Sequence, residues 1–381
     1  MELALLSMLL LGASLPVFAS FGGSAAEDPP DPDADSQRTT DDDDAGARPN
    51  LLDFAEDDGP AATADAAGAD GKVPPDHAGG PGNDTLTGTG DDVVRGRSGD
   101  DSLTGFDDAE VWGGTGDDQV DVFGDYGLAT DGSVGHGGQG DDTLRAEGYG
   151  ALVQGDRGDD TLYVAQDAFG NGGRGDDTVR VSEDATGRGG RGEDLMLATD
   201  GGDAFGGAGR DFMVASTGTD VFGGQGDDWI SVHGDFYPPH GDTSDAFGGA
   251  GDDLFAMSRG AIATGGEGAD NFVVFARETL NENPFPDARV TISDFDAATD
   301  RILVDVDQPV TSFTLTEQLG GTLARIATGQ VGLGPLPEGV EIFLPGVTGL
   351  SRDDFDLVDS ITGSFQRGPD FGLQLGAVSP L

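Results

Sequence analysis

Acidic residues set among glycines are the part of this sequence best suited to chemistry. The stretch Gly137–Leu144 reads GGQGDDTL, and GGPGNDTL, GGTGDDQV, GGRGDDTV, GGQGDDWI and GGAGDDLF are variants of it. Glycines tolerate positive φ and let the backbone approach a ligand closely. Carboxylate and carbonyl oxygens are the ligands that Ca²⁺ takes, whereas Zn²⁺ and Cu²⁺ prefer nitrogen or sulfur. The motif therefore predicts a calcium site.

The overall charge also favours cations as partners. The chain has 381 residues, of which 72 are acidic and 19 are basic, so its formal net charge is −53. Such a charge opposes compaction by self-repulsion. It disfavours nucleic acid and anionic membranes as partners, because phosphates require basic patches. The chain has no cysteine, which excludes disulfides, thiolate catalysis and cysteine-bound zinc.

The motif repeats as G-G-x-G-x-D-x-U-x, where U is a large apolar residue. The early copies lie eight or nine residues apart, and from Asp142 the spacing is 17 or 18 residues with one longer step of 25. We take the acid at the sixth position as the candidate metal ligand. These acids are Asp84, Asp92, Asp101, Asp118, Asp142, Asp160, Asp177, Asp194, Asp211, Asp228, Asp253 and Asp270.

This spacing predicts an all-β fold, a parallel β-roll. Six residues form a loop and three form a short strand with U facing inward, so two loops and two strands make one turn of about 18 residues. Turns stack about 4.8 Å apart, which brings each sixth-position acid next to its equivalent. Such carboxylates repel one another, and a divalent cation between successive turns would reverse the sign of the interaction.

The doubled period indicates that the two edges of the roll differ. One loop of each later turn keeps the glycine frame, whereas the opposite loops read SEDAT, ATDGGDA and ASTGTDV. We expect these opposite loops to bind no calcium, and only residues 79–118 to bind calcium on both edges. Inward pairs are expected at Leu162 and Val164, Val179 and Val181, Leu195 and Leu197, Ile230 and Val232, and Phe255 and Met257, and a core ladder at Phe169, Phe205, Phe222 and Phe247.

The copies GGPGNDTL, GGQGDDTL and GGRGDDTV resemble the repeats-in-toxin (RTX) nonapeptide of hemolysin-type calcium-binding proteins, over about residues 79–274. The resemblance implies a right-handed β-roll in which sixth-position acids and loop carbonyls bind Ca²⁺ between turns. The match is looser at Asp92, whose copy is one residue short, and at Asp194, Asp211 and Asp270, which follow Glu193, Arg210 and Ala269. In the copy GFDDAEVW the sixth position is Glu110.

The resemblance extends beyond the repeats. The stretches VTISDFDAATDRILVDV (290–306) and GVTGLSRDDFDLV (346–358) resemble the segment that follows such repeats in the family. Family members commonly leave the cell by type I secretion, with a signal in the C-terminal region. The resemblance thus implies a secreted protein, or one held at the cell surface.

The remaining sequence divides into three further parts. Residues 1–19 are apolar and predict a signal peptide or membrane anchor. Residues 20–78 predict a disordered acidic linker. The β-roll is expected over 79–284 and a C-terminal β cap with a secretion region over 285–381, where apolar residues alternate at Val290 and Ile292, Ile302, Val304 and Val306, Phe313 and Leu315, and Val340, Ile342 and Leu344.

No catalytic pattern accompanies the repeats. The four histidines form no HExxH, and there is no G-x-S-x-G and no Walker motif. We therefore expect a calcium-binding protein without enzymatic activity, a monomer whose partners are calcium ions and a component of the cell surface or extracellular matrix. The alternative is a targeting or carrier part of a secreted hydrolase system, since serralysin proteases and secreted lipases have similar C-terminal halves.

Overall fold

The computed structural model describes residues 76–124, 132–216, 218–232, 244–276, 278–279, 289–306, 309–318, 320–329, 338–359 and 364–366. Their regular structure is β-strand throughout, apart from one 3-10 turn, η3 (Arg352–Asp354). The N-terminal apolar segment and almost all of the acidic linker lie outside the described residues. Within them, no helix is long and apolar enough to cross a membrane.

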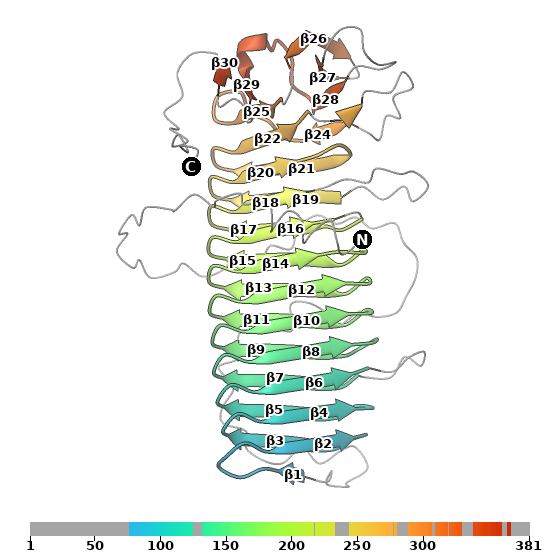
Figure 1. Ribbon diagram of the computed structural model, residues 1–381, viewed down its shortest axis with the longest axis vertical. Coiled ribbons are helices and arrows are strands. Elements are labelled where there is room, and N and C mark those ends of the chain that lie inside the picture. Colours follow the sequence, from blue (N-terminus) through green and yellow to red (C-terminus); the bar gives the residue numbers. More distant parts are fainter. Residues whose placement is uncertain are drawn as a thin grey trace, which may run out of the picture. The chain divides into compact units, whose positions relative to one another are not determined.

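The strands alternate between two sheets, here called sheet A and sheet B (Figure 1). Sheet A contains, in spatial order, β1 (Asp76–Ala78), β3 (Val93–Ser98), β5 (Glu110–Thr115), β7 (Val134–Gln139), β9 (Leu152–Arg157), β11 (Phe169–Arg174), β13 (Thr186–Arg191), β15 (Asp203–Ala208), β17 (Val221–Gln225), β19 (Ser244–Ala250), β21 (Ala261–Glu267), β24 (Val290–Ile292), β28 (Glu338–Pro345), β27 (Gly321–Thr328) and β26 (Val310–Gln318), with β23 (Glu278–Thr279) beside β28. Sheet B contains β2 (Thr85–Thr89), β4 (Ser102–Phe106), β6 (Gln119–Phe123), β8 (Thr143–Glu147), β10 (Thr161–Ala165), β12 (Thr178–Ser182), β14 (Leu195–Ala198), β16 (Phe212–Ala215), β18 (Trp229–Val232), β20 (Leu254–Met257), β22 (Asn271–Phe275), β25 (Arg301–Asp305), β29 (Phe355–Asp359) and β30 (Ser364–Gln366).

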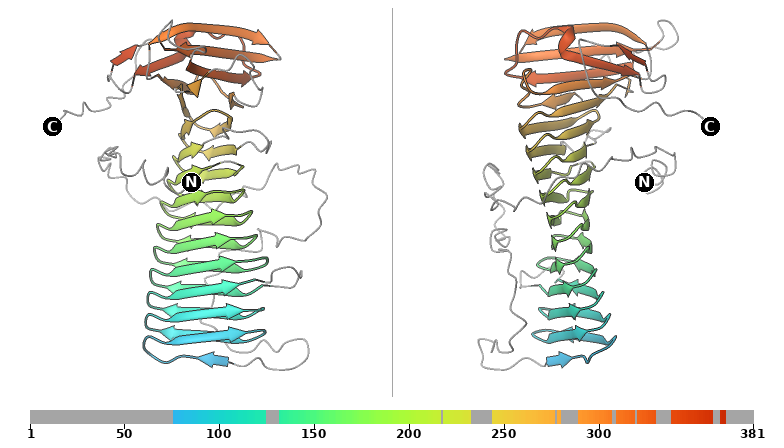
Figure 2. Two further views of the ribbon diagram at one scale, coloured as in Figure 1. Left: turned by 45° about the vertical axis from the view of Figure 1, so that its right-hand side comes forward. Right: turned by 90° about the vertical axis from the view of Figure 1, so that its left-hand side faces the viewer.

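Each turn of the chain adds one strand to each sheet. The result is a parallel β-solenoid of about 11 turns, which confirms the predicted β-roll. Equivalent repeat positions stand in register from turn to turn, for example Leu144 beside Leu162 and Leu162 beside Val179. The side views show these rungs stacked up to the longer strands at the C-terminal end (Figure 2).

The core lies between the two sheets and contains the U residues, the apolar residues two positions after them and the inward residues of sheet A. Leu144, Leu162 and Val179 are completely buried there. The predicted inward pair Leu195 and Leu197 is wrong: both side chains face outward, and Met196 and Ala198 are buried instead. The eighth residue of that copy, the U position, is Met196. The inward residues are therefore Met196 and Ala198, one position after the predicted pair.

Three of the four phenylalanines predicted to form a core ladder do stack, but they do not lie in the core. Phe205, Phe222 and Phe247 stack with ring centroids 4.6 and 4.8 Å apart. They and Phe169 lie at outward positions of sheet A and are only partly buried. Small residues fill the space behind them, such as Ala204, Ala246 and Gly170.

The segment after the repeats continues both sheets before changing direction. Strand β24 pairs in parallel with β21, and β25 pairs in parallel with β22. Strands β26, β27 and β28 are then antiparallel and lie at the C-terminal end of sheet A. The alternating apolar residues predicted there are buried or pack against the core, which confirms these strands.

Candidate metal centre

The loops lie on two edges of the roll. On one edge, here called the glycine edge, each loop of the repeats leads from a strand of sheet A to the next strand of sheet B and carries the glycine-rich motif, with Arg97 and Asp156 in place of its second glycine in two copies. On the opposite edge, the loops return from sheet B to sheet A. Every predicted metal ligand except Asp92 lies on the glycine edge, so the structure brings eleven of the twelve into one column.

Hydrogen bonds connect the column from turn to turn. The backbone N–H of each sixth-position acid donates to Oδ1 of the equivalent acid one turn on, from Asp84 through to Asp270, at 2.7–2.9 Å. From Asp101 onward these side chains are at most 3% exposed. The ladder fixes one carboxylate oxygen of each acid and holds the column in register.

The other oxygen, Oδ2, has no such partner. Nine consecutive acids, from Asp101 to Asp253, each bury an Oδ2 that accepts no hydrogen bond. An unsatisfied buried oxygen costs about 1–3 kcal/mol, and more when it is charged. A column of them therefore indicates that something outside the protein chain completes their interactions.

The first glycine of each motif packs directly against this oxygen. A Cβ built on Gly155 would lie 2.1 Å from Asp160 Oδ2 and 2.4 Å from the carbonyl oxygen of Gly172, one turn on. The same two kinds of oxygen converge beside Gly172, where the distances are 2.2 and 2.5 Å. Glycine is required at this position because a Cβ would collide with the carboxylate oxygen and with the carbonyl oxygen of the next turn, both of which pack directly against the glycine backbone.

The electrostatics of the column lead to the same conclusion. Burial raises the pKa of Asp160 to about 9 and that of Asp194 to about 8, although the hydrogen bond from the preceding acid's N–H lowers both and neighbouring carboxylates raise them further. The pKa of Asp177 rises to about 7 through burial and the charges of Asp159 and Asp176. At neutral pH the column thus holds protons unless a cation replaces them.

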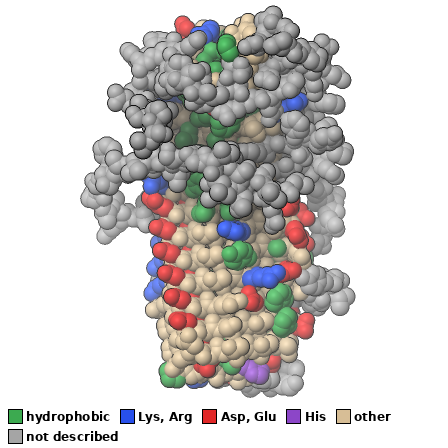
Figure 3. Space-filling model, viewed as in Figure 1, with side chains coloured by type: hydrophobic (Ala, Val, Ile, Leu, Met, Phe, Trp, Pro, Cys, Tyr) green, Lys and Arg blue, Asp and Glu red, His purple; other side chains and the backbone are tan. Residues whose placement is uncertain are grey.

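A second row of acids lies outside the first, at the fifth position of each motif. The backbone N–H of Asp159 donates to Oδ1 of Asp141, and that of Asp176 donates to Oδ1 of Asp159, so this ladder runs in the opposite sense. These side chains are exposed, and acidic side chains lie one above another along one edge of the molecule (Figure 3). The outer row is solvated, whereas the inner row is not.

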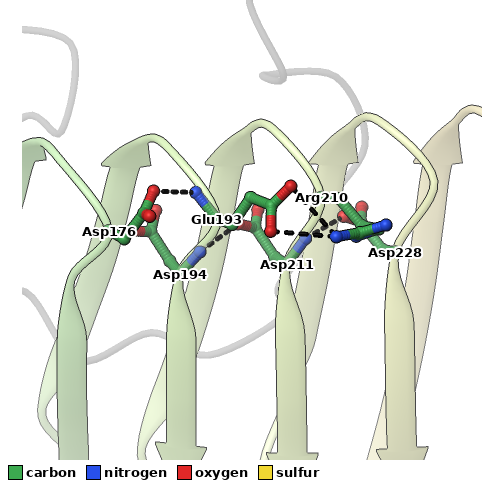
Figure 4. A network of polar contacts seen from close by, with 6 residues as sticks. All are labelled: Asp176, Glu193, Asp194, Arg210, Asp211 and Asp228. Carbon is green, nitrogen blue, oxygen red and sulfur yellow. Dashed lines mark hydrogen bonds and ion pairs between the residues drawn. The ribbon is translucent and has the colours of Figure 1, made fainter. Parts of the chain in front are cut away.

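The outer row changes at Glu193 and Arg210, two of the three departures at the fifth position noted in the sequence. The Arg210 guanidinium donates to both carboxylate oxygens of Glu193, at 2.9 and 3.0 Å (Figure 4). The inner links at Asp194 and Asp211 continue beneath this pair at 2.9 and 2.8 Å. The looser match at these two copies therefore affects the solvated row and leaves the buried column intact.

Asp92 lies on the opposite edge, between β2 and β3. Its Oδ2 accepts a hydrogen bond from the Thr89 N–H at 2.9 Å and lies 3.3 Å from His77 Nε2. No sixth-position acid of the column is bonded to it in the described part of the chain. Glu110 is the first residue of β5, after an opposite-edge loop, and accepts a hydrogen bond from the Trp112 indole.

The later opposite-edge loops turn without the glycine frame. Glu183 and Asp184 in SEDAT have φ of +56° and +60°, and Gln166 and Asp167 one turn earlier have +60° and +62°. Left-handed backbone at non-glycine residues costs roughly 1–2 kcal/mol per residue. These loops are tight, strained turns, and their acids are exposed or only partly buried.

Two further acids extend the column beyond the repeats, and the motif did not identify them. The Asp270 N–H donates to Asp300 Oδ1 at 3.3 Å, so Asp300 takes the place of the next sixth-position acid. Asp294 accepts hydrogen bonds from the N–H groups of Gly265 and Gly266, both at 2.9 Å. A signal was available in the sequence: Asp300 precedes the strand residues RILV as Asp177 precedes TVRV.

These residues fit calcium better than a metal bound by side chains alone. Among the described residues, no three His, Cys, Asp or Glu side chains converge on one point. A cation in the column would therefore take one or two carboxylates and several backbone carbonyls, which is a ligand set that Ca²⁺ accepts. The column of buried Oδ2 atoms provides the carboxylates, and the glycine loops provide the carbonyls.

The chain has little similarity to proteins of known family. No protein-family model matches it, and no curated protein matches it. A matching solved structure is the AlgE6R3 subunit of the mannuronan C5-epimerase from Azotobacter vinelandii, with 22% identity over 45% of this chain and 93% of that one, at a TM-score of 0.27. At this TM-score the likeness carries no argument about the site, which rests on its own geometry.

Proposed function

We propose that the chain is a secreted or cell-surface calcium-binding protein, and that Ca²⁺ bound between its stacked loops drives folding of the β-roll. The observation that carries the proposal is the column of buried, unpartnered Oδ2 atoms, each packed against a glycine and, in most turns, close to a backbone carbonyl of the next turn. Each cation would join two turns. The binding free energy would then contribute directly to folding.

The charge of the chain explains why folding would need the ion. Without a cation, the roll must bury a column of carboxylates that repel one another, and the formal net charge of −53 adds repulsion over the whole chain. A divalent ion in each inter-turn space would reduce both costs. Ten hydrogen-bonded links run from Asp84 to Asp270, and the link to Asp300 provides an eleventh space.

Calcium is proposed over magnesium because of the form of the site. Ca²⁺ accepts six to eight oxygen ligands in flexible geometry, whereas Mg²⁺ requires a tight octahedron and usually keeps several waters. The inner column is almost completely buried and offers carbonyls at fixed spacing. We propose further that the roll acts by binding and not by catalysis, and that the purified chain has no hydrolase activity.

A cation titration of the full chain tests this proposal. We expect the chelated protein at pH 8 to lack most of the β-sheet circular dichroism signal and to gain it on addition of millimolar Ca²⁺, with a lower midpoint than for Mg²⁺. Equilibrium dialysis with metal analysis should count about as many ions as there are inter-turn spaces. Identical spectra with chelator and with calcium, or equal midpoints for the two ions, would contradict the proposal.

A further inference from the structure

The two ends of the roll differ in the strands that cover them. At the C-terminal end, β26, β27 and β28 extend sheet A, and β29 and β30 extend sheet B. At the other end, sheet A begins with the three residues of β1, and sheet B begins with β2, which has β4 as its one partner strand in the described chain (Figure 1). A solenoid requires a cover over each end, and none of the residues that the structure describes covers β2 on that side.

The open edge of β2 has both a backbone and an apolar component. The Ser102 N–H donates to the Asp84 carbonyl and the Gly90 N–H donates to the Phe106 carbonyl, so the even-numbered residues bond to β4. In a parallel ladder the alternate residues, Thr85 and Thr87, then direct their N–H and C=O groups away from β4. Leu86 is only half-buried, whereas its equivalents in the turns above are fully buried.

The sequence of β2 contains nothing that would prevent another strand from pairing with it. Natural edge strands are protected by charges, proline or bulges. The five residues TLTGT have none of these, and three are threonines, which favour strands. In a chain with 72 acidic residues, an uncharged strand at the open end is unexpected for a surface that faces only solvent.

We propose that this end binds a second copy of the chain, by antiparallel pairing of β2 with β2 of the partner about Thr87. The strand is self-complementary in this register. On the outer face, Thr87 lies opposite the partner subunit's Thr87, and Thr85 lies opposite the partner subunit's Thr89, and such threonine pairs are favourable. On the inner face, Leu86 lies opposite the partner subunit's Gly88, so a large residue meets a small one. The contact has two-fold symmetry, the commonest arrangement in homodimers.

The size of the contact makes the association weak. A five-residue strand is about 17 Å long and the sheets are about 10 Å apart, so the end offers on the order of 200 Å². A stable interface buries about 800 Å² per partner. The 75 residues before β1 are strongly acidic and join the roll at this same end, so their charges make two copies repel there. We expect a concentration-dependent dimer that salt strengthens, in place of the monomer expected from the sequence.

Single cysteines test the register directly, because the chain has no native cysteine. Directly opposed residues of an antiparallel pair have Cα atoms about 4.5–5.5 Å apart, within the range of a disulfide. In saturating Ca²⁺ under mild oxidation, Thr87→Cys should give a covalent dimer on non-reducing gels. Thr104→Cys, at the equivalent outward position one turn inside, is the matched control and should stay monomeric. Equal crosslinking of the two variants would overturn the proposal.

Sedimentation velocity over a range of concentrations provides the second measurement. Thr87→Pro removes the outward N–H without removing a bond to β4, and should raise the dimer dissociation constant at least tenfold. Thr87→Val keeps the N–H and should dimerise like the native chain. Circular dichroism of the same samples reports whether the roll is folded, so loss of dimer is distinguished from failure of calcium-driven folding. A native chain that is folded and monomeric at every concentration and salt level would refute the proposal.

Discussion

The two edges of the roll contain similar residues but treat them differently. Asp177 on the glycine edge is 1% exposed, with an unpartnered Oδ2 beside Gly172. Asp184, seven residues later, is exposed on the opposite edge in a turn with φ of +60°. Both are aspartates in acidic loops that repeat every turn.

The difference shows that acidic residues alone do not make the site. On the glycine edge, the first glycine of each loop lets a buried carboxylate oxygen, and in most turns a carbonyl oxygen of the next turn, pack directly against the backbone. On the opposite edge, the loop after β12 reverses in two left-handed residues, Glu183 and Asp184, whose side chains are exposed. The glycine frame is therefore the signal of a cation site, and the aspartate is a signal only within it. The following experiments compare the edges, from the largest expected effect to the smallest.

Adding a side chain at the first glycine of one motif should have the largest effect on stability. In Gly172→Ala the new Cβ would lie 2.2 Å from Asp177 Oδ2 and 2.5 Å from the Gly189 carbonyl oxygen, and the backbone cannot move away without disturbing two turns. We expect a loss of about 3 kcal/mol or more of unfolding free energy in calcium, the upper range for overpacking. Chemical denaturation in saturating Ca²⁺ measures it.

Gly90→Ala is the matched control on the opposite edge. Gly90 has φ of +61°, and its nearest neighbour to a new Cβ is the Asp107 carbonyl oxygen at 3.9 Å. Only backbone strain should result, about 1–2 kcal/mol, with no change in the number of ions bound on the glycine edge. If the two variants lose equal stability and equal numbers of ions, the glycine edge has no special role.

Removing one charge from each edge should have the next largest effect. Asp177→Asn keeps an oxygen to accept the Asp160 N–H but replaces a charged ligand that would serve the ions on both sides of its turn. We expect a several-fold higher calcium midpoint and fewer bound ions by calorimetric titration. Asp184→Asn removes the same charge at a position whose left-handed backbone asparagine also tolerates, and should leave both quantities unchanged. Equal shifts would show that calcium is not confined to one edge.

The sequence predicted the fold and most of the column because the repeat fixes both period and register. An 8–9-residue motif that doubles to 17–18 residues places one glycine loop on each turn, and eleven of the twelve predicted ligands line up. Asp92 could not be assigned to an edge from spacing alone, because both loops carry glycines in the first turns. Its place is decided by the strand that precedes it: Asp92 follows a strand of sheet B.

The errors have a common physical origin in the side-chain alternation of strands. Shifting a strand assignment by one residue exchanges its inner and outer faces. Leu195, Met196 and Leu197 are all apolar, so hydrophobicity does not show which residue is inward. The phenylalanines of sheet A were assigned to the core for the same reason. The inward positions next to them in each strand hold glycine or alanine, and these small residues face the core instead. Asp300 was missed because its loop, SDFDAATD, has no glycine.

The pH dependence of the metal-free chain should also follow from the glycine edge. The pKa values of its buried acids are raised, to about 7 at Asp142, about 9 at Asp160 and about 8 at Asp228, chiefly by burial. An acid whose pKa is raised in the folded state stabilises the fold fully at pH values below its pKa in the unfolded chain, near 4. This contribution is lost as the pH rises through the pKa of the folded state. In chelator, the β signal should therefore be larger at pH 5.5 than at pH 8.5.

Calcium should reverse this dependence, because protons and calcium compete for the same oxygens. The calcium midpoint of folding should rise as the pH falls from 8 to 6. Circular dichroism at fixed pH values measures both effects. A metal-free chain whose β signal does not change between pH 5.5 and 8.5 would show that the column does not control folding.

The smallest effect is expected from relieving strain on the opposite edge. Asp184 has φ of +60° between Glu183, also left-handed, and the buried Ala185. In Asp184→Gly, glycine adopts this conformation without steric cost, but it loses more entropy on folding. Aspartate tolerates left-handed backbone better than most residues, so the net gain should be below about 1 kcal/mol. Denaturation in saturating Ca²⁺ should show this gain with no change in the calcium midpoint or ion count. A change in ion count without a change in stability would mean that Asp184 binds calcium, and the contrast between the edges would then be wrong.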